Sequence, residues 1–279
     1  MKIALGIEYA GCNYYGWQKQ SISPTIQETV ESALSAIANE IINVYCAGRT
    51  DTGVHAIQQV IHFETSTKRK LHSWILGANS KLPKDISVIW ALDVDDNFHA
   101  RYTAENRTYQ YLILNRRSRP AILNGLVTWE CRELNYKKMV DSSKCLIGEN
   151  DFTSFRAVSC QSDSPIRTIH ELEIGRIEDW FVITVRANGF LHHMVRNIAG
   201  VLIAVGIGKE SIKWVADVLG AKDRTLAGVT AEPDGLYLVN VESVSYTHLR
   251  AHETRRELVC RLLLEKKKGG GGGGGGGGG

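Results

Sequence analysis

The segment that most constrains this chain is a glycine-containing polar loop between two runs typical of β-strands. The runs are residues 41–46 and 59–63, and both are rich in the β-branched and aromatic residues that favour strands. Gly48 and Gly53 can adopt backbone angles closed to other residues, so we expect a sharp turn on either side of Asp51. The pattern predicts a loop that holds a reactive carboxylate at the end of a sheet.

Arg49 lies two residues before Asp51. A guanidinium this close favours the ionised form of a carboxylate, so we expect Arg49 to keep Asp51 charged. The residues alone leave two interpretations open: a loop with a reactive carboxylate, and a polar hairpin with a structural Arg–Asp pair.

The C-terminal segment, residues 244–279, differs from the rest of the chain. It contains three lysines followed by an unbroken glycine run from Gly269 to Gly279, and it resembles a translated sequencing adapter followed by a homopolymer. We therefore expect an artefactual, disordered tail and leave it out of the fold prediction.

Removing this tail changes the charge balance. The whole chain has 33 basic and 30 acidic residues; without the seven basic and three acidic residues of the tail, 26 and 27 remain. A net charge near −1 gives no general attraction to nucleic acid, so any RNA site requires local clusters of basic residues.

Cysteine usage and hydropathy indicate a reducing, cytoplasmic setting. One of the six cysteines lies in the tail, and the other five contain no C-x-x-C pair, so we expect neither a zinc site nor a disulfide framework. Glu8 interrupts the first apolar run, which argues against a signal peptide, and no apolar stretch is long enough to span a bilayer.

Hydrophobic periodicity predicts the order β-α-β-β-α-β twice, and therefore an α+β fold. The first half comprises a strand over 2–9, a helix that starts at the capping box Thr25–Glu28, strands over 41–46 and 59–63, a helix over 71–79 and a strand over 86–92. The second half comprises a strand over 108–114, a helix over 135–146, strands over 167–174 and 180–187, helices over 195–205 and 211–219, and a strand over 236–241.

Residues 47–56, Ala-Gly-Arg-Thr-Asp-Thr-Gly-Val-His-Ala, resemble the signature loop of the tRNA pseudouridine synthase A family. The resemblance continues in family order through residues 2–9, 14–18, 98–102, 150–155 and 192–197. It implies an enzyme that isomerises uridine to pseudouridine at positions 38–40 of the tRNA anticodon stem–loop.

The resemblance also implies an architecture. Two split βαβ (ferredoxin-like) halves would join through a central antiparallel sheet, with helices on one face and the active-site cleft between the halves. Residues 1–103 would carry the catalytic loop, and residues 104–243 would bind RNA and complete the active site.

Three catalytic residues follow from the resemblance. Asp51 is the expected catalytic carboxylate and nucleophile, Arg196 the arginine that pairs with it from the opposite half, and Tyr109 the tyrosine that stacks on the target uracil. From the residues alone, Tyr109 is also typical of a core strand. Whether Asp51 attacks C1′, attacks C6 or abstracts a ribose proton stays open.

RNA contact is expected from Arg49, which would enter the space left by the flipped base or would cap the loop. Two further segments are implied by the resemblance: Phe98, His99, Ala100, Arg101 and Tyr102, and Ser159, Cys160, Gln161, Ser162 and Asp163. Asp163 stands where relatives are expected to have a basic residue. The basic clusters 68–70 and 116–119 suit phosphate or are solvated faces.

The isomerisation needs no redox step or group donor, so no cofactor is expected. No metal is expected either, because the adjacent His192 and His193 would point to opposite faces of a strand. The implied partners are tRNA and a second copy of the chain in a homodimer, with no membrane. Competing interpretations are a pseudouridine synthase with another RNA target, a non-catalytic RNA-binding module, and a metal hydrolase built on Asp51, His55 and the paired histidines.

Overall fold

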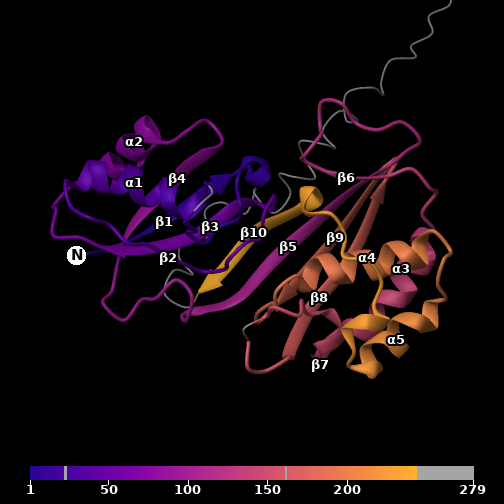
Figure 1. The fold of residues 1–279 in the computed structure, drawn as a ribbon. Coiled ribbons are helices and arrows are strands. Elements are labelled where there is room, and N and C mark those ends of the chain that lie inside the picture. Colours follow the sequence, from indigo (N-terminus) through magenta and orange to yellow (C-terminus); the bar gives the residue numbers. More distant parts are fainter. Residues whose placement is uncertain (22–23, 161, 244–279) are drawn as a thin grey trace, which may run out of the picture. The chain divides into compact units, whose positions relative to one another are not determined.

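The computed structural model describes residues 1–21, 24–160 and 162–243, so the predicted tail lies outside the described residues (Figure 1). The described strands form one large sheet in the order β4-β1-β3-β10-β5-β9-β8-β7, with β2 paired to β3 and β6 paired to β5. They are β1 (Lys2–Tyr9), β2 (Tyr45–Cys46), β3 (His55–Glu64), β4 (Ile86–Val94), β5 (Ala104–Asn115), β6 (Thr128–Glu130), β7 (Gly148–Asp151), β8 (Ile166–Ile177), β9 (Trp180–Ala187) and β10 (Leu236–Ser243). The helices are α1 (Ile26–Ala38), α2 (Leu71–Lys81), α3 (Tyr136–Ser143), α4 (Met194–Gly206) and α5 (Ile212–Ala221). The fold is thus a mixed α and β fold with one large sheet.

Most predicted elements agree with the structure to within about four residues at each end, the usual uncertainty of such boundaries. The short strands β6 and β7 were not predicted. Contacts group the described residues into a single unit, so the division into 1–103 and 104–243 stays a prediction. Among the described residues, no helix has the length and apolar character needed to cross a membrane.

Residues 41–44 do not form the strand predicted for them, since β2 contains only Tyr45 and Cys46. The backbone N–H groups of Ile42 and Val44 donate instead to side chains of α1, at Ser35 Oγ (2.9 Å) and Glu31 Oε1 (3.1 Å). The alternating burial of this segment resembles that of a strand, but polar side chains of a helix satisfy its backbone.

Strand β10 joins the two parts of the sheet, because it lies between β3 and β5 (Figure 1). It pairs antiparallel with β5 but parallel with β3, through Tyr237 with His55 and Leu238 with Ala56. The prediction of an antiparallel central junction is therefore wrong for this pair. The reason is the position of the short 3-10 turn η5 (Pro233–Gly235), which directly precedes β10 and packs against the start of β3. The two strands therefore begin next to each other and run in the same direction.

His55 stabilises this junction between β3 and β10. Its Nδ1 accepts a hydrogen bond from the Gly11 N–H (3.0 Å), which leaves Nε2 to donate to the Asp234 carbonyl oxygen (3.1 Å). The ring is 1% exposed and stacks on Tyr237, with centroids 4.6 Å apart. Burial lowers the pKa of His55, so the ring is neutral and each nitrogen keeps one role.

Replacing His55 with alanine is expected to lower the free energy of unfolding by about 2–4 kcal/mol, because the Gly11 N–H and the Asp234 carbonyl lose their partner and the ring packing is lost. Urea unfolding measures the change. The matched control is His72→Ala on the exposed surface of α2, which should change the free energy by less than about 0.5 kcal/mol. Similar losses in both variants would contradict the role of His55 in the junction.

Candidate functional site

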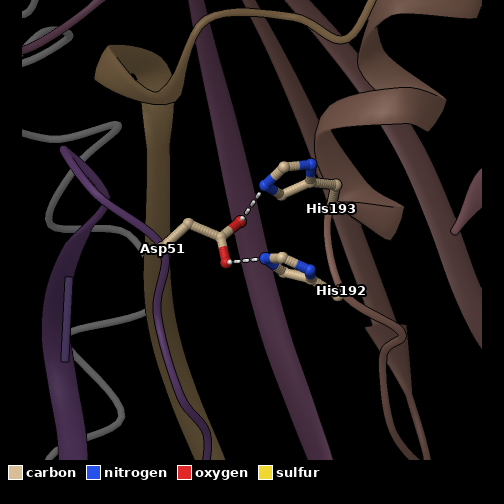
Figure 2. Close-up of side chains that lie close together, drawn as sticks. All are labelled: Asp51, His192 and His193. Atoms are coloured by element: carbon tan, nitrogen blue, oxygen red, sulfur yellow. Dashed lines mark ion pairs between the residues drawn. The ribbon is translucent and has the colours of Figure 1, made fainter. Parts of the chain in front are cut away.

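The signature loop, residues 47–56, is fixed on one side by the segment that follows β1. The Trp17 N–H donates to the Thr50 carbonyl (2.9 Å), and the Gly53 N–H donates to the Tyr14 carbonyl (3.3 Å). The hydroxyl groups of Tyr9 and Thr50 lie 2.8 Å apart. These contacts hold the backbone on both sides of Asp51, whose side chain points away from β10 toward His192 and His193 (Figure 2).

The two loop glycines have different roles. Gly53 has a φ of 79°, and a Cβ there would lie 2.9 Å from Pro233 Cγ, so both the backbone angle and the space require glycine. Gly48 lies in a bend of the chain, as predicted, but it has no positive φ, so its backbone angles are open to other residues as well. A Cβ at Gly48 would lie 3.5 Å from the Tyr109 hydroxyl, so this glycine leaves the space beside Tyr109 open.

Arg107 connects the loop to two other segments, and its role was not predicted. Its guanidinium donates to the carbonyl groups of Ala47 (3.0 Å), Arg101 (2.6 Å) and Asn188 (3.0 Å). The three acceptors belong to the signature loop, to the segment before β5 and to the segment that leads to His192. In the sequence Arg107 only precedes the strand predicted over 108–114, and that position does not reveal carbonyl partners so distant in the chain.

The Asp51 carboxylate lies among three side chains from the start of α4 and the residues before it. His192 Nε2 is 3.2 Å from Oδ1, His193 Nε2 is 3.6 Å from Oδ2, and Arg196 Nη1 is 3.7 Å from Oδ2. Figure 2 shows both histidine rings turned toward the same carboxylate. We call Asp51, His192, His193 and Arg196 the Asp51 cluster.

The two histidines do not lie on a strand, so the prediction that they point apart is wrong. Strand β9 ends at Ala187, and His193 is the N-cap residue of α4, with a left-handed backbone (φ 63°). This reversal brings the ring centroids of His192 and His193 to 4.1 Å. Sequence periodicity gave no sign of it, because histidine only occasionally adopts positive φ.

The charges of the cluster keep Asp51 ionised. Burial acts to raise the pKa of Asp51, but the hydrogen bond from His192 and the electrostatic interactions with His193, His192 and Arg196 outweigh it and lower that pKa. The same hydrogen bond raises the pKa of His192. Burial lowers the pKa of His193, which therefore favours its neutral form.

Arg196 is held by the segment that precedes β10. Its Nε donates to the Ala231 carbonyl (2.8 Å), and its own carbonyl accepts from the Ala231 N–H (3.2 Å). Gly200, one turn later on α4, permits this approach, since a Cβ there would lie 2.0 Å from the Val229 carbonyl oxygen. These contacts fix the position of the Arg196 guanidinium next to Asp51.

Arg49 does not act on Asp51 as predicted. Its side chain is exposed, and no ion pair joins it to Asp51 among the described residues. The adjacent Thr50 is turned inward to Tyr9, so the chain direction places the Arg49 side chain outward. The alternative of a structural Arg–Asp hairpin pair fails for the same reason.

Tyr109 lies on β5 beside the loop. It is 7% exposed, its hydroxyl is near Gly48, and its ring meets Phe190 edge to face at 5.0 Å. Burial, followed by the negative charge of Asp51, raises the pKa of Tyr109. The hydroxyl is therefore protonated at neutral pH.

The first predicted RNA segment is only partly on the surface. The side chains of Phe98 and Ala100 are buried in the core, so the prediction that they contact RNA needs correction for these two. Arg101 and Tyr102 are exposed, with the guanidinium 5.8 Å from the Tyr102 ring centre. His99 is half-buried, and its ring lies 4.3 Å from that of Tyr102.

The second predicted RNA segment begins next to the Asp51 cluster. Ser159 is exposed, and its Oγ lies 3.2 Å from His192 Nδ1. Cys160 packs partly against the core, Ser162 accepts a hydrogen bond from Arg167 (2.8 Å), and Asp163 is exposed. Gln161 lies outside the described residues.

A metal ion is the one cofactor whose ligand types the cluster supplies. Ligand atoms of Asp51, His192 and His193 lie within 4.8 Å of one another. Arg196 opposes a cation there, because its guanidinium already contacts the same carboxylate. The absence of a metal stays a prediction.

Comparison with known proteins shows which family the chain matches. The family model described as tRNA pseudouridine synthase matches residues 6–103 and 143–242, which include Asp51 and Arg196 but not Tyr109. Two similar relatives, both named tRNA pseudouridine synthase A, come from Legionella pneumophila (strain Lens) and Nitrosococcus oceani. The first is 57% identical over 241 residues, 86% of this chain and 92% of that protein; the second is 54% identical over 242 residues, 87% and 93%. A solved Cbf5-Nop10-Gar1 complex matches 72% of this chain and 45% of that chain at 14% identity and a TM-score of 0.34, which is too low to carry an argument.

Arg196→Ala is expected to lower the free energy of unfolding at pH 7 by about 1–3 kcal/mol, because Asp51 keeps its charge with one partner fewer. The lowered pKa of Asp51 contributes stability that is present above the unfolded pKa, about 3.9, and is lost as the pH falls through the folded value. The difference from the parent protein should therefore shrink as the pH is lowered below about 4, measured by urea unfolding. Lys144→Ala, which breaks the exposed pair with Asp141, is the matched control and should leave the free energy of unfolding nearly unchanged. A pH-independent difference would contradict the pairing.

Proposed function

The chain belongs to the tRNA pseudouridine synthase family, and from this we propose that it isomerises uridine to pseudouridine in tRNA. The observation that supports this most directly is the Asp51 cluster, in which an ionised carboxylate faces an arginine and two histidines inside the matched region. The proposed target is the anticodon stem–loop at positions 38–40.

In this proposal Asp51 acts on the ribose or uracil as the catalytic carboxylate and nucleophile. Such a role needs the charged form, which the cluster favours. Arg196 holds Oδ2 and compensates the negative charge while the C1′–N1 bond breaks and the uracil turns to rejoin through C5. No redox partner or group donor enters this bond exchange.

Tyr109 is proposed to stack on the extruded uracil. Base–aromatic stacking contributes about 1–3 kcal/mol, which offsets part of the cost of unstacking the base. Because its hydroxyl is protonated at neutral pH, Tyr109 is better suited to stacking and to donating a hydrogen bond than to removing the C5 proton.

The exposed residues around the cluster are proposed to contact the RNA. Arg49 and Arg101 are exposed cations, and neither forms an ion pair with a described acidic side chain, so both are available to phosphate. Tyr102 and His99 offer aromatic faces. Ser159, Cys160, Ser162 and Asp163 form the second contact segment. The basic clusters 68–70 and 116–119 are exposed, although Arg69 donates to the Ile37 carbonyl and Arg116 to the Ser118 carbonyl.

Several finer features of the family resemblance are part of this proposal. The chain would consist of two split βαβ halves, residues 1–103 and 104–243, with helices on one face of the sheet and the catalytic cleft between the halves. It would work as a homodimer in the cytoplasm.

Asp51→Asn is expected to abolish pseudouridine formation while the fold and tRNA binding are kept, because the amide keeps the size but loses the charge. Pseudouridine mapping of tRNA incubated with the parent protein and the variant measures the activity, and a filter-binding assay measures the affinity. Asp217→Asn, a change in an exposed carboxylate of α5, is the control and should leave the activity unchanged. Turnover by Asp51→Asn above about 1% of the parent rate would refute the assignment.

A homodimer predicts a molecular mass near twice the 30.9 kDa of the chain in light scattering. Measurement over a tenfold range of protein concentration separates a stable dimer from weak association. A monomeric mass together with full activity would show that the dimer is not needed.

A further inference from the structure

The two oxygens of the Asp51 carboxylate have different partners. Oδ2 lies near His193 (3.6 Å) and Arg196 (3.7 Å), whereas His192 (3.2 Å) is the described ion-pair partner of Oδ1. A carboxylate held through one oxygen can still rotate about its Cβ–Cγ bond. The contact to Oδ1 therefore fixes the plane of the carboxylate, and His192 makes that contact.

His192 also has contacts on the side that faces away from Asp51. Its second ring nitrogen, Nδ1, lies 3.2 Å from Ser159 Oγ, and its backbone carbonyl accepts a hydrogen bond from the Ala157 N–H (2.9 Å). The ring also contacts that of His193. A side chain with both ring nitrogens engaged and its backbone tied has a defined orientation before any substrate binds.

The support for His192 is a surface turn, residues 157–160. A hydrogen bond from the Cys160 N–H to the Ala157 carbonyl closes the turn (3.0 Å). Val158 is 97% exposed and Ser159 is also exposed. One end of the chain of contacts Ser159–His192–Asp51 thus lies at the surface and the other end lies at the catalytic carboxylate.

We propose that His192 is a positioning residue of the reaction: it sets the orientation of the Asp51 carboxylate through Oδ1 and receives its own orientation from Ser159 and the 157–160 turn. This inference rests on the proposed function. It assigns to His192 an effect on the chemical step rather than on RNA affinity, because the contact that it makes is to Asp51.

The test is steady-state kinetics of pseudouridine formation in tRNA by purified variants. His192→Leu should lower kcat by about 10- to 100-fold, the size of effect typical when a reacting group or its oriented partner is misplaced, with KM changed by less than about threefold. His192→Gln keeps an N–H donor at similar reach and should recover most of that loss. His72→Leu on α2 is the matched control and should leave kcat and KM unchanged.

Ser159→Ala tests the second contact. It should lower kcat by about 3- to 10-fold alone and add little to the effect of His192→Leu, because both changes break the same chain of contacts. Additive losses would show that Ser159 acts independently of His192 and would overturn that part of the proposal.

Three results would overturn the positioning role while the parent enzyme is active: an unchanged kcat in His192→Leu, a loss confined to KM, or no recovery by His192→Gln. Thermal melting of each variant checks that the fold is intact. If the parent protein forms no pseudouridine in any tRNA, the proposed function fails instead. In that case titration of the Asp51 carboxyl carbon by ¹³C NMR still tests the contact, because an unchanged midpoint in both His192 variants would reject it.

Discussion

The negative charge of Asp51 is the constraint on which the rest of the site depends. A largely buried carboxylate stays ionised only when donors and cations lie close to it. Here those groups come from residues 192–196, far along the chain, so the signature loop and the start of α4 must be kept at a fixed separation. That requirement fits the continuous sheet, which connects the strands next to the signature loop with those that lead to α4 without a flexible linker.

The supports for this separation converge on the residues before and within β10. Ala231 anchors Arg196, and the Asp234 carbonyl accepts from His55 at the end of the signature loop. Arg107 adds a third connection through the carbonyl groups of Ala47 and Asn188. The segments on both sides of the Asp51 cluster thus bind either to residues 231–234 or, through Arg107, to β5, which neighbours β10 in the sheet.

The sequence predicted the helices, most strands and the nearness of Arg196 to Asp51, because periodicity, capping and the family resemblance carry that information. It could not predict the parallel pairing of β10 with β3, which depends on where η5 packs. It also misplaced the histidine pair, since a left-handed residue at His193 has no periodic signal. The strand expected at 41–44 failed because its amides find Glu31 and Ser35, contacts that hydrophobic pattern does not encode.

The position of β10 has a consequence for how the protein is made. Chains emerge from the ribosome with the N-terminal part first, and early parts can fold before later ones appear. Strand β10, at residues 236–243, lies in the sheet between β3 and β5, which are made long before it. Until it emerges, no described strand lies between those two, and the nascent chain carries Asp51 and Arg196 without the contacts of Ala231 and Asp234, the residues just before β10. The last supports of the enzyme's charge pair are therefore added only near the end of translation.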